Sequence, residues 1–136
     1  MHGNTLILDA FWVSNKKDFP TLLDPSTKEG KVFHDFYEGT ARHLGWMDLV
    51  LLKSIIKKHN ITHIILKNLI ALGRIAQRTK VVRVCVSYEN HRTIVRTVPE
   101  KEDFEHCKPV YTDAVIGGWD STEEDNEVHV LSLIHI

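Results

Sequence analysis

A helical stretch that runs directly into an apolar β-stretch is the feature that most limits the folds open to this chain. Over residues 46–59, WMDLVLLKSIIKKH, apolar side chains recur at helical spacing. Lysines gather near its end, where they suit the negative end of the helix dipole. Asp48 can cap the start of this helix and Asn60 can end it. Residues 62–66, THIIL, then predict a buried strand.

Two further β-rich stretches complete the predicted fold. Residues 5–13, TLILDAFWV, are nearly continuous in apolar residues and predict a buried strand of a parallel or mixed sheet. The order strand, helix, strand is typical of a β-α-β unit. Residues 81–88, VVRVCVSY, and 92–98, RTIVRTV, alternate on either side of a turn-like segment, which predicts a β-hairpin. The sequence therefore predicts an α/β fold with one β-α-β unit and one hairpin.

The remaining stretches are polar, or are interrupted by glycine and proline. They are predicted as a long loop at 14–30, a polar loop at 39–45, a loop or short helix at 67–78, a helical turn at 99–106 and a solvated acidic tail at 121–127. Residues 31–38 have no clear pattern. The last six residues, LSLIHI at 131–136, are apolar and follow the acidic stretch. They resemble a translated sequencing adapter, so we expect a non-native tail; a genuine final strand is the alternative.

Composition excludes several classes of protein. The chain has 136 residues, of which 43% are apolar and 26% charged, as in a globular domain. Its net charge of -1 gives no basic field for nucleic acid. The two cysteines, Cys85 and Cys107, form no CxxC pair, which favours reduced thiols and a cytoplasmic location. No stretch of about 20 apolar residues exists, so no membrane span is predicted.

Four stretches, in order along the chain, resemble motifs of the adenylosuccinate synthetase family. The family has FPTE, a G-T-T-T-G-R-x-R-R-x-G-W-x-D loop, ITHLALTKLD with IKVCVAY, and CKPVYEELPGW. The matching stretches here are FPT at 19–21, GTARHLGWMDLV at 39–50, ITHIILK at 61–67 with VRVCVSY at 82–88, and CKPVY at 107–111 with Gly118 and Trp119. The resemblance runs over residues 5–120.

This resemblance implies a carboxy-terminal piece of a large, P-loop-like nucleotide-binding ligase domain, spanning residues 1–130. Enzymes of this family join L-aspartate to IMP with GTP and magnesium, and they act as cytoplasmic homodimers. GTP phosphorylates the 6-oxygen of IMP, and the aspartate amine then displaces the phosphate. The glycine-rich WGDEGKGK loop that holds the catalytic base, a magnesium contact and the phosphates does not occur in this sequence. We therefore expect the catalytic residues and magnesium ligands upstream, and none within this chain.

The aspartate loop carries the first group of expected site residues. Counted back from Gly45, Arg42 falls on a family arginine that contacts substrate and nucleotide. A guanidinium can hold a carboxylate or phosphate through two charge-assisted hydrogen bonds. Gly39 and Thr40 can support substrate binding through a backbone N–H and a hydroxyl. Ordinary turn and surface roles for these three residues stay open. The loop is shorter than in the family, and Ala41 and His43 stand where arginines are usual.

The second group of expected site residues belongs to the pocket for the nucleotide base. Lys67 matches the lysine of the family's TKLD motif, which lies along guanine; a lysine that merely closes a strand is the alternative. Leu69 replaces the aspartate that accepts hydrogen bonds from guanine, and a leucine cannot accept one. Asn68 could take over this role if the register shifts by one residue.

Other residues suggest structural roles or leave the function open. Trp46 and Trp119 are expected in the core. His106 and Cys107 are adjacent but have no second pair of ligands, so no metal site is expected. Two other readings of the family resemblance stay open. One is a non-catalytic or phage-borne binding module, and the other is a related ligase that uses another purine nucleotide or ATP.

Overall fold

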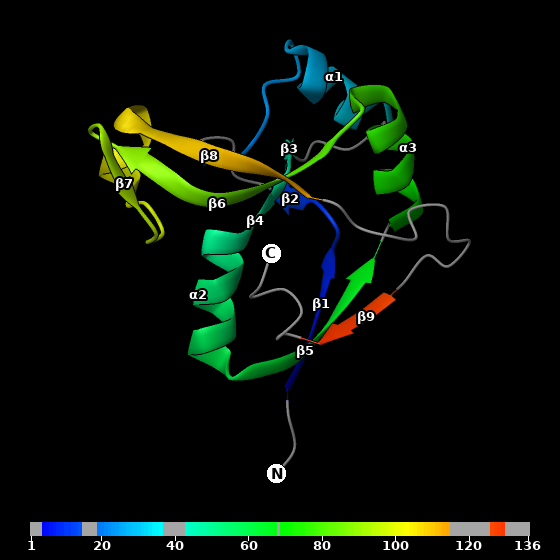
Figure 1. Cartoon of the computed structure of the whole chain (residues 1–136), viewed down its shortest axis with the longest axis horizontal. Helices are drawn as coiled ribbons and strands as arrows, with labels where there is room; N and C mark the ends of the chain where they lie inside the picture. The colour runs from blue at the N-terminus through cyan, green and yellow to red at the C-terminus, as the bar shows by residue number, and fades with distance from the viewer. Residues whose placement is uncertain (1–3, 15–18, 37–42, 68, 115–125, 130–136) are drawn as a thin grey trace.

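The computed structural model describes residues 4–14, 19–36, 43–67, 69–114 and 126–129, and the following statements concern these residues. In chain order, the elements are β1 (Asn4–Asp9), β2 (Trp12–Ser14), α1 (Lys28–Phe36), β3 (His43–Gly45), β4 (Met47–Asp48), α2 (Leu49–His59), β5 (Ile61–Lys67), α3 (Leu69–Thr79), β6 (Val82–Asn90), β7 (Thr93–Val95), a 3-10 helix (Lys101–His106), β8 (Cys107–Ala114) and β9 (Asn126–His129). Figure 1 shows α1 and α3 together at one end of the molecule and α2 below β6.

The predicted β-α-β unit is confirmed. β1 and β5 pair in parallel, and α2 leads directly into β5 (Figure 1). β9 pairs antiparallel with the other edge of β5, which gives the strand order β1-β5-β9. The prediction of a solvated tail through residue 127 is therefore wrong for Asn126 and Glu127, which lie in β9 opposite Leu66 and Ile65. An open strand edge presents unpaired N–H and C=O groups, and this backbone pairing overrides the polar composition.

The second sheet is built around β6 and confirms the predicted hairpin. β7 pairs antiparallel with the end of β6, and the turn residues His91 and Arg92 have φ of 50° and 70°. β8 pairs antiparallel along the length of β6, and β4 pairs with it in parallel. The helical turn predicted at 99–106 is confirmed as the 3-10 helix that precedes β8.

The single buried strand predicted at 5–13 is wrong. β1 ends at Asp9, and Trp12 begins a separate strand that pairs with β3, so residues 43–45 are also a strand and not part of a loop. Between the two strands Phe11 is fully buried, with its ring 5.5 Å from that of Phe33. Ile7, by contrast, is 59% exposed. The packing of Phe11 turns the chain away from β1, which an apolar run alone does not reveal.

The predicted helix at 46–59 is confirmed over 49–59, with both expected caps. Asp48 is extended, and its carboxylate accepts a hydrogen bond from the Leu51 N–H at 3.1 Å. Asn60 ends the helix in the left-handed region, with φ of 50°. The helix starts later than predicted because Met47 and Asp48 pair with β6 as β4. The next helix along the chain, α3, extends over 69–79 and is longer than the predicted loop or short helix.

Trp46 lies at the centre of the core, as expected. Its ring is fully buried and meets Phe33 edge-on at 4.8 Å. The indole N–H donates to a carboxylate oxygen of Glu29 at 3.1 Å, and Glu29 also pairs with Arg83 at 3.2 Å. A buried indole N–H needs such a partner. Trp119 lies outside the described residues, and among the described helices none is long and apolar enough to cross a membrane.

Candidate functional site

The carboxyl ends of β1 and β5 form the edge of the sheet where the sequence places the base pocket. Asp9 and Lys67 are paired at this edge, and the Ala10 N–H donates to the Lys67 carbonyl at 2.9 Å. The chain then enters α3 at Leu69 (Figure 1). Ligands of open α/β sheets bind outside the carboxyl ends of parallel strands.

The chemistry available at this edge suits an anionic or hydrogen-bonding ligand. The Lys67 side chain is exposed, and Asp9 is half-buried. The first N–H groups of a helix have no partner within it and attract negative charge, so the start of α3 adds to the Lys67 ammonium. Leu69 is the first residue of α3, but its side chain, like Asn68 as a whole, lies outside the described residues.

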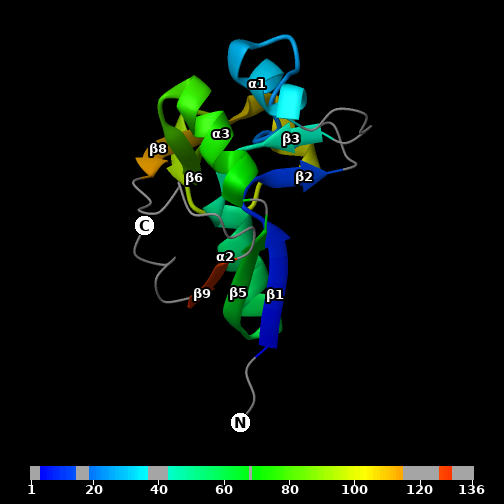
Figure 2. The ribbon, with the colours of Figure 1, turned by 90° about the vertical axis from the view of Figure 1, so that its right-hand side faces the viewer.

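The aspartate loop, with Gly39, Thr40 and Arg42, also lies outside the described residues. The structure does describe where the chain emerges from it. His43 begins β3 opposite Ser14, and β2 starts three residues after β1 ends. Figure 2 shows β2 and β3 lying just beyond the arrowhead of β1. His43 and Lys67, the described residues next to the two groups, therefore both lie beyond or at the carboxyl end of the β1–β5 pair.

Thr21, Asp48 and Tyr88 form a buried polar cluster that connects three segments of the chain. The Tyr88 hydroxyl donates to Asp48 Oδ2, and the Thr21 hydroxyl lies 3.4 Å from the same oxygen. All three side chains are fully buried. Burial raises the pKa of the Asp48 carboxyl, and the hydrogen bonds from Tyr88 and Leu51 partly oppose that shift. The cluster joins the segment around Thr21, the start of α2 and β6.

Sequence reasoning identified Asp48 only as a helix cap and missed its two partners. A signal was present, since Thr21 and Tyr88 each close one of the stretches that resemble the family motifs. Gly45 belongs to the same arrangement. A Cβ atom on Gly45 would lie 2.1 Å from the Thr21 carbonyl oxygen, so only glycine permits this close backbone approach.

A metal site does not form within the described part of the chain. No three His, Cys, Asp or Glu side chains are grouped there so as to hold an ion.

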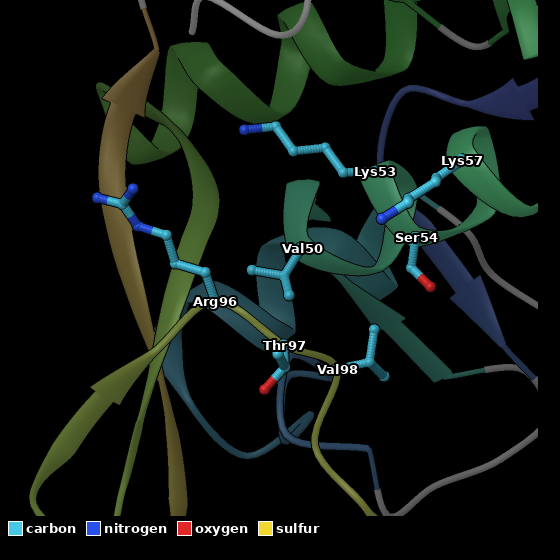
Figure 3. Close-up of a pocket in the computed structure, with 7 residues that line it drawn as sticks. All are labelled: Val50, Lys53, Ser54, Lys57, Arg96, Thr97 and Val98. Carbon is cyan, nitrogen blue, oxygen red and sulfur yellow. The ribbon is translucent and has the colours of Figure 1, made fainter.

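A separate pocket of about 370 Å³ lies between α2 and the segment that follows β7 (Figure 3). Its lining residues are Val50, Lys53, Ser54, Lys57, Arg96, Thr97 and Val98. It shares no residue with the edge at Lys67.

Comparison with known proteins decides the family. The family model for adenylosuccinate synthetase matches residues 20–132. The chain belongs to the adenylosuccinate synthetase family. Within that family, the Clostridium kluyveri synthetase is 31% identical over 140 residues, covering 93% of this chain and 31% of the relative. The Clostridium novyi synthetase is 33% identical over 115 residues, covering 81% of this chain and 26% of the relative.

A solved structure of the adenylosuccinate synthetase family shares the fold. The fully ligated Plasmodium falciparum synthetase aligns with a TM-score of 0.65 at 19% identity, covering 81% of this chain and 28% of that one. The predicted α/β fold is thereby confirmed. The chain spans less than a third of the length of these synthetase relatives.

Proposed function

We propose that this chain is part of a cytoplasmic, homodimeric ligase that converts IMP, L-aspartate and GTP into adenylosuccinate, GDP and phosphate, a step of AMP synthesis. The single observation that carries this proposal is the family match over residues 20–132. The parallel edge of β1 and β5, where Lys67 ends β5 two residues before α3 begins, supports it because this is where such a sheet binds a nucleotide.

The proposed roles follow from the chemistry of the side chains. Arg42 holds the carboxylate of aspartate or a phosphate of the nucleotide, and Gly39 and Thr40 shape the loop around that anion. Lys67 lies along the purine, with Asn68 and Leu69 next to it. Magnesium would neutralise phosphate charge in such a ligase. Its ligands are expected in the family's WGDEGKGK loop, a motif that this sequence does not contain.

The 136-residue chain alone is therefore expected to be inactive. Positioning and charge stabilisation supply most of the catalysis in phosphoryl transfer, and the residues that would supply them are not in this sequence. The test compares the purified chain with a longer protein from the same locus that carries a WGDEGKGK-type loop. Aspartate-dependent product should form only with the longer protein. Product from the 136-residue chain, or none from the longer protein, would contradict the proposal.

Arg42→Ala in that longer protein tests the aspartate loop separately. Hydrogen bonds to charged groups contribute about 1.5–3 kcal/mol each, so kcat/KM for aspartate should fall roughly tenfold or more. The matched control is Arg74→Ala, which replaces an exposed arginine of α3 and should leave kcat/KM for aspartate unchanged. Equal kinetics for the Arg42 variant and the parent would show that the loop arginine does not contact aspartate.

A second candidate is a homologue that binds another purine nucleotide or ATP, or that has lost catalysis. Leu69 favours it, because the family carboxylate that reads guanine is absent, and Ala41 and His43 remove two positive charges from the loop. A longer protein that binds nucleotide without ligating aspartate would support this candidate over the first.

A further inference from the structure

The pocket between α2 and the segment after β7 has three cationic side chains in its lining. Lys53 and Lys57 lie four residues apart on α2, so they share one face of the helix, and Arg96 adds a third cation from the facing segment. Figure 3 shows these side chains around the hollow. The whole chain has a net charge of -1, so this local excess is not part of a generally basic surface.

These three cations have no ion-pair partner among the described residues. The ion pairs there join Arg78 with Asp35, Arg83 with Glu29 and His91 with Asp103. Like charges at helix positions i and i+4 repel each other, and for Lys53 and Lys57 this repulsion opposes their favourable interaction with the helix dipole. A bound anion would remove this repulsion.

The polar and apolar parts of the lining define the kind of anion. Ser54 and Thr97 are lining residues with hydroxyl groups, and a hydroxyl can donate to a phosphate oxygen. Val50 is buried and Val98 packs against its cluster, so the floor is apolar. A volume of about 370 Å³ is in the range of small-molecule sites.

We propose that this pocket binds a small organic phosphate. The phosphate lies among Lys53, Lys57 and Arg96, and a compact apolar group of the same molecule lies against Val50 and Val98. This site is separate from the nucleotide edge at Lys67 and does not depend on the ligase activity. The pocket is partly open, but its three cations are gathered in one place, whereas a nucleic acid would need a basic track along the surface.

The experiment titrates the 136-residue chain with phenyl phosphate, inorganic phosphate and phenol, followed by methyl and amide NMR shifts. Because the edge at Lys67 can also attract a phosphate, binding is assigned to the pocket only from the signals of its own lining residues, which are not part of that edge. Phenyl phosphate should shift the signals of Val50, Thr97 and Val98, with a Kd of about 1 mM at low ionic strength. Inorganic phosphate should bind at least fivefold more weakly because it cannot use the apolar floor, and phenol should not bind measurably.

Charge variants provide the matched controls. Lys53→Gln/Lys57→Gln and Arg96→Gln should each weaken phenyl phosphate binding roughly tenfold. Lys58→Gln removes the same charge from an exposed position of α2 outside the pocket and should change Kd less than twofold. Circular dichroism checks that each variant keeps its fold; if a Gln variant unfolds, Lys→Arg at the same position, which keeps the charge, should retain binding.

Several results would overturn the proposal. One is the absence of shifts at Val50, Thr97 and Val98. A second is equal weakening by Lys58→Gln, which would indicate a diffuse charge effect. A third is inorganic phosphate binding as tightly as phenyl phosphate, and a fourth is a single-stranded RNA decamer binding the same residues more tightly than either.

Discussion

At the scale of single residues, Asp48 connects the largest number of structural features. Its carboxylate caps α2 through the Leu51 N–H and accepts from the hydroxyls of Thr21 and Tyr88 in a fully buried position. A buried carboxylate is costly unless its oxygens are hydrogen-bonded, and here both oxygens have donors. The stability of the region thus depends on one side chain that three segments share.

Replacing Asp48 should destabilise the chain by several mechanisms at once. Asp48→Ala removes the helix cap and leaves the Tyr88 hydroxyl buried without an acceptor, so the free energy of unfolding should fall by roughly 2–4 kcal/mol in urea. Glu105→Ala, which removes an exposed carboxylate, is the control and should change it by less than about 0.5 kcal/mol. A loss below about 1 kcal/mol for Asp48→Ala would mean that the cluster contributes little.

The raised pKa of the Asp48 carboxyl predicts how the free energy of unfolding changes with pH. Burial raises the pKa of this carboxyl in the folded state above the unfolded value of 3.8. Its contribution to stability is therefore fully present below pH 3.8 and is lost as pH rises through the raised folded pKa. The free energy of unfolding, taken as wild type minus the non-titrating Asp48→Asn, should decrease as pH rises through this window. An increase would show that the hydrogen bonds outweigh burial.

Nucleotide choice is the property that Leu69 is expected to change. Leucine would leave the two hydrogen-bond donors of guanine without a partner, at a cost of about 1–3 kcal/mol each, so the longer protein should prefer GTP over ATP weakly or should prefer ATP. Competition of the two nucleotides measures this preference, and Leu69→Asp should raise it. A GTP preference above about a hundredfold in the unchanged protein would show that Asn68, or a residue outside this chain, recognises the guanine base.

At the scale of elements, α2 determines where its neighbours lie. It starts where β4 leaves the second sheet and ends where β5 enters the first, so one helix of 11 residues joins the two sheets. The left-handed Asn60 makes the sharp return into β5, with its N–H donating to the Ile56 carbonyl. The direction of β5, and with it the position of Lys67, depends on this cap.

Asn60 should therefore tolerate glycine but not alanine. A φ of 50° costs a residue with an ordinary side chain about 1 kcal/mol, whereas glycine adopts it freely. We expect Asn60→Ala to lower the free energy of unfolding by roughly 1 kcal/mol and Asn60→Gly to change it by less than about 0.5 kcal/mol, both measured by urea unfolding. Equal effects of the two substitutions would show that the conformation of residue 60 does not limit stability.

At the scale of the whole molecule, the core excludes both thiols from solvent. Cys85 is fully buried on β6 and Cys107 is 5% exposed at the start of β8. Burial raises the pKa of Cys85 to about 12, and the nearby Asp48 carboxylate adds to the shift. The thiolate is the reactive form, so neither side chain is available to reagents while the fold is intact.

Thiol labelling should therefore report unfolding of the whole chain. At pH 8, a disulfide reagent such as DTNB should react with both cysteines at least about 100-fold more slowly in native buffer than in urea. Cys107→Ser isolates the signal of Cys85, which should be the slower of the two. Rapid labelling of Cys85 in native buffer would mean that β6 opens locally without global unfolding.

Local structures and family motifs could be predicted from the sequence alone. The periodicity of residues 46–59 and their capping residues were enough for α2, and alternation around a turn was enough for the β6–β7 hairpin. Lys67 ends β5, and its proposed role in nucleotide binding stays a prediction. The proposed roles of Gly39, Thr40, Arg42, Asn68 and Leu69, and the expected non-native tail at 131–136, stay predictions.

Several contacts between distant segments could not be predicted from the sequence and follow from the packing of the folded chain. The break after Asp9 follows from the packing of Phe11 on Phe33, and β9 exists because β5 has a second edge to pair. The partners of Asp48 lie 27 and 40 residues away in sequence. The cationic pocket likewise joins α2 to residues after β7. Spacing along one chain reveals contacts within a helix or a hairpin, whereas contacts between elements depend on how buried surfaces fit together.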